Sequence, residues 1–397
     1  MKLHSTDFLK SKIALMALVF LTFACATSDQ NISNSGDGSR INKVIDSVKD
    51  IAAGNKSEMD LLAKNCPENQ KEGLQFLIEN MPERDLKNLS ADFLLQNLNY
   101  AYKVMDEVKW GKRIPKEIFL NYILPYANLH ERRDNWRKDF YDQFLPLVKN
   151  LETPSEATLL LNDKLWDIVN VRYSTKRPKA DQSPYESIDA GLASCTGLSI
   201  LLIDVCRAVG IPARFVGVPL WKDHSGNHSW LEIWDNGWHY LGAFEKSPLN
   251  ETWFGERAKT SDDSNWKYSI YANSFKKTDV IFPPLFDSTA TYVYAEIVTD
   301  RYSANVNDEG KINLAVRLFD KQNGKRVIGD VTIKKDGEII GSGKTKDEKR
   351  DYNDFLIFNV DPNSEVEIIA DFNGKIKTEK MKLNDSKYQF INITLNN

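Results

Sequence analysis

The spacing of hydrophobic residues divides this chain into distinct parts. From about residue 41 to 172 apolar positions recur at helical intervals, and Ser90 is placed to cap a helix that has Leu94 and Leu98 on one face. From about residue 290 the pattern alternates, as in KINLAVRLF, and Asn-Gly and Asp-Gly pairs separate the alternating runs. This predicts a helical N-terminal region and a C-terminal antiparallel β-sandwich of roughly 100 residues.

Between these regions lies a segment that is apolar on nearly every side. Residues 195–209, CTGLSILLIDVCRAV, have the composition of a helix buried inside a domain. Gly210, followed by Ile-Pro, ends this helix, and the small residues 191–194 let the chain turn sharply before it. Cys195 is therefore expected at the N-terminal end of a buried helix.

That position suits a nucleophile. Backbone N–H groups and the positive end of the helix dipole stabilise a thiolate over a thiol. The N–H of Cys195 can also donate to the oxyanion that forms when the sulfur attacks a carbonyl. A lone cysteine at a helix start is nevertheless more often a small buried filler than a catalyst. Catalysis at Cys195 therefore requires a base from elsewhere in the sequence.

A predicted β-hairpin downstream offers that base. Residues 226–245, GNHSWLEIWDNGWHYLGAFE, alternate on both sides of Asn236-Gly237, the strongest short hairpin signal. If these two residues form the whole loop, His228 lies directly opposite Glu245, with Cβ atoms about 5 Å apart. The carboxylate can then hold the imidazole in the orientation that a general base requires. A three-residue loop would place Phe244 opposite His228 instead, so the pairing depends on the register.

The other histidines fit this role less well. His239, flanked by aromatic residues beyond the turn, is expected to pack or to lie on the surface. His130 belongs to a charged stretch, residues 130–140, that is expected to form a solvated helix face. His224 and His228 are four residues apart, but the Ser-Gly-Asn between them is typical of a loop rather than a helix. With no second ligand pair nearby, neither a metal site nor a cofactor is expected.

The first residues have the features of an export signal. Lysines precede an apolar stretch, residues 13–24, that is too short to span a bilayer comfortably. Cys25 directly follows and is expected to be lipidated, as in a bacterial lipoprotein, with ordinary cleavage nearby as the alternative. Either outcome predicts an exported protein of the cell envelope, in the periplasm or held at the outer membrane by an N-terminal lipid.

The composition excludes one broad class of partner. The 397 residues include 52 Lys and Arg and 56 Asp and Glu, which gives a net charge of −4 at pH 7. Such a chain offers no general electrostatic attraction for nucleic acid, so no nucleic-acid partner is expected. The length and the 42% hydrophobic content are sufficient for two or three domains.

Three motifs together resemble the transglutaminase-like superfamily, papain-like thiol enzymes with a Cys on a helix followed by His and an acid on adjacent strands. The motifs are Gly-x-x-Ser-Cys195, Gly210-Ile-Pro-Ala-Arg214 and Asn227-His228-Ser-Trp230-x-Glu232. The helical stretch with MPERDL, WGKRIP and LPYANLHERRDNWR resembles the N-terminal extension of bacterial envelope members. The resemblance implies a papain-like core of α+β class.

One position departs from the family pattern. Members usually carry Asp in a W-x-x-x-D setting after the hairpin turn, whereas here Trp238 is followed at that distance by Gly242. Glu245, three residues further on, is the expected substitute. The motifs do not mark a second oxyanion donor; Gln182 and Tyr185, upstream of the cysteine, are the candidates.

The expected fold class is α+β, with five segments along the chain. They are an export signal (1–25), a flexible tether (26–40), a helical N-terminal region (41–150), a transglutaminase-like core (151–283) and an Ig-like β-sandwich (284–397).

These features predict a thiol enzyme that acts on a peptide, protein or peptidoglycan-type amide. Cys195 attacks the carbonyl, His228 transfers the proton, and Glu245 orients His228. Attack on the thioester by water or by an amine decides between hydrolysis and crosslinking. The side chains expected to bind substrate are Trp221, Trp230 and Gln182. The alternatives are an inactive module of the same superfamily that binds peptide or glycan, and a cysteine peptidase of that superfamily.

Overall fold

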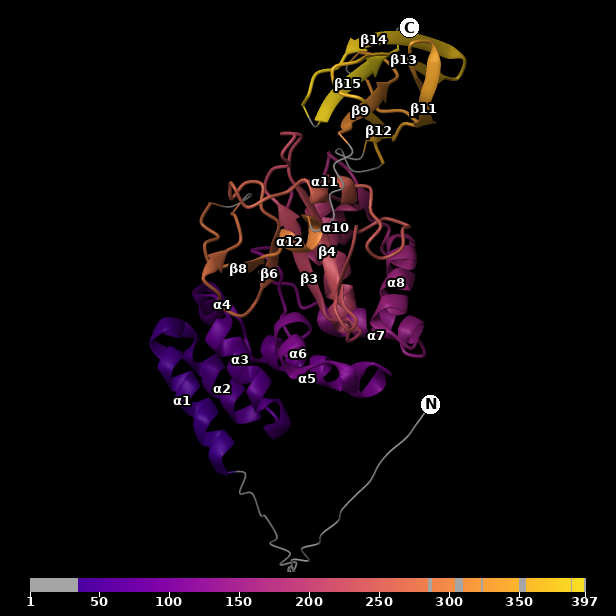
Figure 1. Cartoon of the computed structure of the whole chain (residues 1–397). Coiled ribbons are helices and arrows are strands. Elements are labelled where there is room, and N and C mark those ends of the chain that lie inside the picture. The colour runs from indigo at the N-terminus through magenta and orange to yellow at the C-terminus, as the bar shows by residue number, and fades with distance from the viewer. Residues whose placement is uncertain are drawn as a thin grey trace, which may run out of the picture.

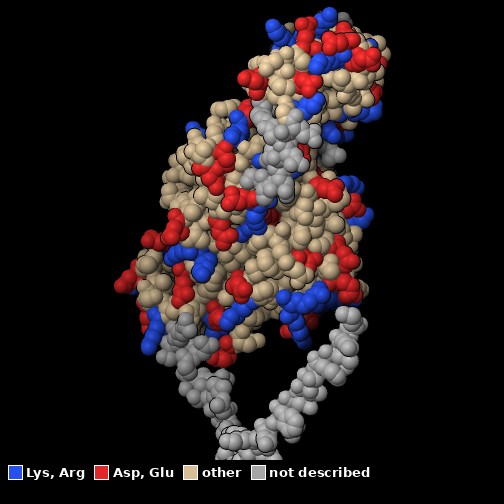
Figure 2. Space-filling view, in the orientation of Figure 1, with Lys and Arg blue, Asp and Glu red and all other residues tan. Residues whose placement is uncertain are grey.

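The chain forms three successive parts (Figure 1): N-terminal helices, a central sheet with helices around it, and a C-terminal β region. The computed structural model describes residues 35–284, 288–303, 310–322, 324–349, 355–386 and 388–395. The expected export signal, with Cys25, lies outside these ranges. Within them, no helix is both long and apolar enough to cross a membrane. Acidic and basic side chains are interspersed over the face shown in Figure 2.

The N-terminal helices surround a hydrophobic core of their own. Their amphipathic faces bury residues such as Leu74 and Leu94. Ser90 caps α5 (Ala91–Glu107), because its hydroxyl accepts a hydrogen bond from the N–H of Phe93 at 3.2 Å. The first helix begins at Ser35, inside the stretch expected to form a tether. The other elements of this region are α1 (Ser35–Ala52), η1 (Ala53–Asn55), α2 (Lys56–Asn65), η2 (Glu68–Gln70), α3 (Lys71–Asn80), α4 (Glu83–Asn88), η3 (Gly111–Arg113) and α6 (Lys116–Tyr122). Two further helices, α7 (Arg137–Val148) and α8 (Pro154–Val169), contribute instead to the core of the central part of the chain.

The charged stretch, residues 130–140, is partly buried, although Arg132 and Asp139 remain exposed. Glu131, Asp134 and Arg137 are each less than a tenth exposed. This stretch joins the N-terminal helices to the buried helix α10 (Cys195–Ala208), because its charged groups have partners inside the protein. The expectation of a solvated face was therefore wrong for these three charged residues. The guanidinium of Arg137 donates to Asn97 Oδ1 and to the carbonyl oxygens of Ile123, Leu124, Pro125 and Arg207.

A six-stranded antiparallel sheet forms the centre of the fold. Its strands follow the order β5-β4-β3-β6-β8-β7, and α10 packs against β3 and β4. The strands are β3 (Ala213–Val218), β4 (His228–Trp234), β5 (Trp238–Leu241), β6 (Tyr271–Ser274), β7 (Val280–Ile281) and β8 (Tyr294–Ile297). Because β8 pairs with β6, this sheet extends past the domain boundary expected at residue 283. The smaller elements around it are β1 (Arg172–Tyr173), α9 (Pro184–Ala190), β2 (Leu192–Ala193), α11 (Gly255–Lys259) and α12 (Asp300–Ser303).

The hairpin predicted around Asn236-Gly237 forms with a loop one residue longer than expected. Trp234 pairs directly with Trp238, so the loop also contains Asp235. Asn236 lies in the left-handed region at φ 56°, which Asn tolerates better than most residues. A shift of one residue changes every cross-strand partner.

The predicted direct pairing of His228 with Glu245 is therefore wrong. β5 ends at Leu241, so the paired part of the hairpin stops before it reaches either residue. The chain then turns, with Phe244 in the left-handed region at φ 70°. Glu245 consequently follows a turn and not a strand.

The C-terminal β region, within residues 310–395, has two sheets that share a core. Their strand orders are β11-β10-β13-β14 and β12-β9-β15. Leu314, Ile333 and Ile368 are among the buried residues that the two sheets contribute. β15 pairs with β9 in parallel, so the prediction of a purely antiparallel region was wrong. The strands are β9 (Ile312–Phe319), β10 (Asp330–Lys335), β11 (Glu338–Lys344), β12 (Leu356–Val360), β13 (Glu365–Phe372), β14 (Lys375–Lys382) and β15 (Tyr388–Thr394).

Candidate active site

Cys195 is the first residue of α10. Ser194 precedes it as the N-cap, and the Ser194 hydroxyl accepts a hydrogen bond from the N–H of Gly197 at 3.1 Å. Gly191 ends α9 in the left-handed region at φ 63°, which gives the sharp turn before the helix. The rest of α10 is buried, whereas Cys195 is partly exposed. The thiol therefore lies at the positive end of a buried helix and can be reached from solvent.

His228 is the first residue of β4 and is only 3% exposed. Four aromatic rings surround its imidazole, with centroids at 4.7 Å for Trp253, 4.9 Å for Phe254, 5.8 Å for Trp230 and 6.2 Å for Trp221. Packing of this kind limits rotation of the imidazole and keeps water away from its faces. The ring is thus held in a defined orientation.

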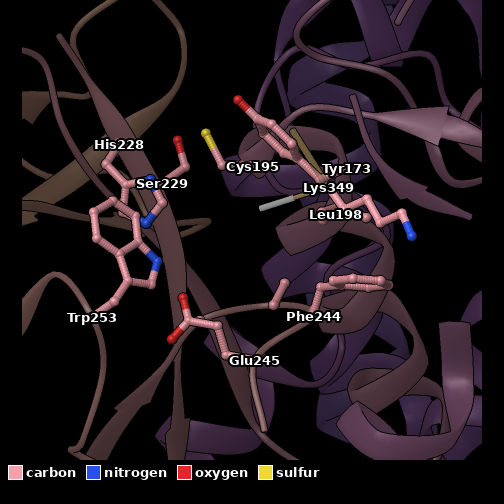
Figure 3. A pocket seen from close by; sticks show the side chains of 11 residues that line it. Tyr173, Cys195, Leu198, His228, Ser229, Phe244, Glu245, Trp253 and Lys349 are labelled. Carbon is pink, nitrogen blue, oxygen red and sulfur yellow. The ribbon is translucent and has the colours of Figure 1, made fainter. Parts of the chain in front are cut away.

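Cys195, His228 and Glu245 line one pocket (Figure 3). They come from three separate places: the start of α10, the start of β4 and the turn after β5. In Figure 3 the thiol of Cys195 points toward the side of the pocket that carries His228. The carboxylate of Glu245 points toward that same side from another direction. The turn thus brings Glu245 into the pocket although the predicted strand pairing does not exist.

The pocket has an empty volume of about 400 Å³, including open solvent. It combines a nucleophile, an imidazole and a carboxylate, the three kinds of group that acyl transfer through a thiol requires. Among the described residues, no group of three or more His, Cys, Asp and Glu side chains is arranged to hold a metal ion. The lining residues are Tyr173, Cys195, Leu198, His228, Ser229, Gly242, Ala243, Phe244, Glu245, Trp253 and Lys349.

Two residues considered as oxyanion donors are engaged elsewhere. Gln182, also expected to bind substrate, is 1% exposed, and its amide nitrogen donates to the carbonyl oxygens of Glu186 and Leu192 at 3.1 and 3.0 Å. The hydroxyl of Tyr185 donates to a carboxylate oxygen of Asp139 at 2.6 Å. Neither residue lines the pocket, although Gln182 packs against the first turn of α10, where its Cβ lies 3.6 Å from an ideal Cβ built on Gly197.

The two tryptophans expected to bind substrate are core residues. Trp221 and Trp230 are 1% and 0% exposed, and their rings stack with centroids 6.1 Å apart. Nε1 of Trp230 donates to the hydroxyl of Tyr302 at 2.9 Å. Both tryptophans pack near the ring of His228, but neither lines the pocket.

Of the residues that line the pocket, only Cys195, His228 and Glu245 were predicted as site residues, and four of the others have large side chains from unexpected places. Tyr173 lies in β1, which pairs with β2 directly before α10, and two-residue strands leave no periodic signal in the sequence. Phe244 and Trp253 follow β5, where only their aromatic character marks them. Lys349 comes from the C-terminal β region, so its sequence position gives no hint of the site.

The motif residues Arg214 and Glu232 form a buried ion pair outside the pocket. Nε of Arg214 donates to Oε2 of Glu232 at 2.8 Å. The hydroxyl of Tyr302 and the guanidinium of Arg301 donate to the same carboxylate at 2.6 to 2.7 Å. These bonds connect β3, β4 and α12, and β4 begins with His228. The ion pair therefore stabilises the strand that carries the imidazole.

Comparison with family models identifies part of this chain. Residues 145–243 match the model of the transglutaminase-like superfamily. This chain carries a transglutaminase-like domain. The matched span includes Cys195 and His228, whereas Glu245 lies just beyond its end. Comparison with curated proteins found no match.

Two solved structures are similar to the chain that carries this transglutaminase-like domain. One is from Cytophaga hutchinsonii and is described only provisionally as a cysteine protease; it has 22% identity over 36% of this chain and 48% of its own, with a TM-score of 0.28. The other is red sea bream transglutaminase, with 10% identity over 70% of this chain and 65% of its own, and a TM-score of 0.28. The chain thus spans about half of the first structure and just under two thirds of the second.

Proposed function

We propose that this protein is a thiol enzyme that cleaves or transfers amide bonds of peptides or proteins through a thioester on Cys195. The observation that carries the proposal is the pocket that Cys195, His228 and Glu245 line together. The transglutaminase-like domain at residues 145–243 supports the same chemistry. The position of the thiol at the start of a buried helix adds to this support, because a thiolate is favoured there.

In the proposed reaction the sulfur of Cys195 attacks the amide carbonyl and His228 accepts the thiol proton. The carbon–nitrogen bond then breaks, His228 returns the proton to the departing amine, and the thioester remains. Water resolves the thioester to an acid, or a second amine resolves it to a new amide. Glu245 holds His228 in the orientation that both proton transfers need.

Two groups are proposed to stabilise the oxyanion. One is the backbone N–H of Cys195, in the first turn of α10. The other is the hydroxyl of Tyr173, which lies in Figure 3 on the same side of the pocket as the thiol. Tyr173 takes the place that Gln182 and Tyr185 were expected to fill.

We also propose that the substrate is a peptide, protein or peptidoglycan-type amide encountered outside the cytoplasm. The support for this location is the lysine-rich and then apolar N-terminal sequence that ends at Cys25. The apolar side chains of Leu198, Phe244 and Trp253 give the pocket walls against which a peptide chain can pack.

Mass spectrometry of a peptide library incubated with the purified protein tests the proposal. Hydrolysis yields two fragments whose masses sum to the peptide plus one water, whereas transfer attaches an added primary amine to the acyl part. Both kinds of product should disappear in Cys195→Ala. Products that persist in that variant would overturn the proposal. A wild-type protein that forms neither products nor an acylated Cys195 would favour a binding module instead.

A further inference from the structure

Gly242 and Glu245 together differ from the usual arrangement of the acid in this superfamily. Gly242 occupies the position at which the W-x-x-x-D setting has an aspartate, and Glu245 follows three residues later. Both residues line the pocket. The question is how an acid displaced along the chain reaches the imidazole without a strand to carry it.

The space beside Gly242 is filled by the carboxylate of Glu245. An ideal Cβ built on Gly242 would overlap Oε1 and Cδ of Glu245 and would lie 2.8 Å from Oε2, closer than real Cβ atoms approach. Gly242 is not among the glycines in the left-handed region, so its backbone conformation would accept a side chain. What excludes a side chain at position 242 is therefore the carboxylate that already occupies its place.

The turn that leads to Glu245 is held by Asn162 of α8. Asn162 is 3% exposed, and its side-chain nitrogen donates to the carbonyl oxygens of Gly242 at 3.0 Å and of Glu245 at 2.8 Å. Its side-chain oxygen accepts a hydrogen bond from the N–H of Phe244 at 3.0 Å. Phe244 lies in the left-handed region at φ 70°, which costs a non-glycine residue about 1 kcal/mol or more. The side chain of Asn162 thus donates two hydrogen bonds to the turn and accepts one from it. Together these three bonds offset the conformational cost at Phe244 and hold the turn.

We propose that Gly242 and Asn162 are positioning residues that deliver the Glu245 carboxylate to the space an aspartate at position 242 would fill. Asn162 holds the backbone of the turn, and the absence of a side chain at Gly242 leaves room for the carboxylate. The proposal rests on the proposed function, because positioning of the acid matters only if His228 acts as a base.

Gly242→Ala tests whether the Glu245 carboxylate needs the space beside Gly242. Gly54→Ala is the matched control. An added Cβ at Gly54 would meet nothing within 4 Å, and Gly54 lies far from the pocket in sequence and in the N-terminal helices. The carboxylate is the far end of a flexible side chain, so Gly242→Ala should displace it and leave the fold intact. We expect the kcat for amide turnover to fall about 10²-fold, as on loss of proton-transfer assistance, with little change in KM. Gly54→Ala should match the wild type.

A double-mutant cycle tests whether Gly242 and Glu245 act through the same carboxylate. Glu245→Ala alone should lower kcat as much as Gly242→Ala does, and the two changes combined should be no worse than either, because both remove the same carboxylate. Gly242→Asp combined with Glu245→Ala returns a carboxylate to the vacated space. This double variant should recover at least about tenfold of the activity that Glu245→Ala loses.

Asn162→Ala tests the turn, and Asn162→Gln tests whether any amide on α8 is sufficient. Both variants should lower kcat, because Ala removes the amide and the longer Gln side chain cannot repeat the three hydrogen bonds. The double variant Gly242→Asp with Glu245→Ala should be insensitive to Asn162→Gln.

Unchanged kcat in Gly242→Ala, or additive losses in the cycle, would overturn the inference and leave the proposed function standing. Absence of Cys195-dependent products in the wild type would instead refute the proposed function. If Gly242→Ala failed to fold, the comparison of Glu245→Ala with and without Gly242→Asp would decide the matter.

Discussion

The described cysteines differ sharply in their surroundings. Burial raises the pKa of the Cys66 thiol to about 11 and that of the Cys206 thiol to about 12. At pH 7 a thiol of pKa about 11 is ionised in only about one molecule in 10⁴. Cys195, by contrast, is partly exposed at the start of α10.

Iodoacetamide at pH 7 should therefore alkylate Cys195 about tenfold faster, or more, than Cys66 and Cys206, because the thiolate is the reacting form. Peptide mass spectrometry over a time course measures the three rates. In Cys195→Ala no rapidly labelled site should remain. Equally slow labelling of all three thiols would contradict an activated Cys195.

Tyr173→Phe removes only the hydroxyl proposed as an oxyanion donor. Loss of one such donor should lower kcat about 10²-fold. Tyr185→Phe is the matched control, since the hydroxyl of Tyr185 donates to Asp139 and does not line the pocket. Steady-state rates on the same amide substrate compare the two variants. Equal rates in both would remove Tyr173 from the proposed mechanism.

The sequence predicted the helix and the hairpin that carry the site. It did not predict the hairpin register or the turn that brings Glu245 into the pocket. Buried apolar residues and a cap signal mark α10, and alternation marks β4 and β5. The predicted register of β4 against β5 was wrong by one residue. Asp235, Asn236 and Gly237 all favour turns, so the sequence does not determine how many of them form the loop. The turn that brings in Glu245 depends on Asn162, whose contact with it is long-range and leaves no periodic signal.

The ion pair between β3 and β4 supports the hairpin that carries His228. Glu232→Ala leaves the buried guanidinium of Arg214 without its main partner, so the free energy of unfolding should fall by about 3 kcal/mol or more. Glu296→Ala is the control, because Glu296 also pairs with Arg214 but its side chain is 48% exposed. That change should cost less than about 1 kcal/mol. Urea unfolding followed by circular dichroism measures both, and similar losses would contradict a central role for Glu232.

The three-part organisation of the protein was visible from periodicity, but its limits were not. β8 belongs to the central sheet although it lies beyond the boundary predicted at residue 283, because its backbone pairing with β6 is long-range and leaves no local signal. The parallel pairing of β15 with β9 also has no local signature, since alternation is the same in parallel and antiparallel strands. Burial of Arg137 depends on partners in α5 and α10, which its own sequence neighbourhood does not reveal.

Anchoring by Cys25 remains a prediction that cell fractionation can check. Cys25→Ser, expressed in a bacterium with a lipoprotein pathway, should move the protein from the membrane fraction to the soluble fraction, because acyl chains supply the membrane affinity. Metabolic labelling with an alkyne fatty acid should mark the wild type and not the variant. A variant that keeps both the label and the membrane location would refute lipidation at Cys25.

Lys349 and Cys195 line the same pocket, although one comes from the C-terminal β region and the other from the core. Domains generally fold as units, with the N-terminal ones first as the chain is made. Cys195 is thus in place before Lys349 completes the lining of the pocket. On the proposed function, a molecule whose C-terminal β region has not yet folded would lack the wall that Lys349 supplies, so the onset of amide chemistry would follow the folding of that region.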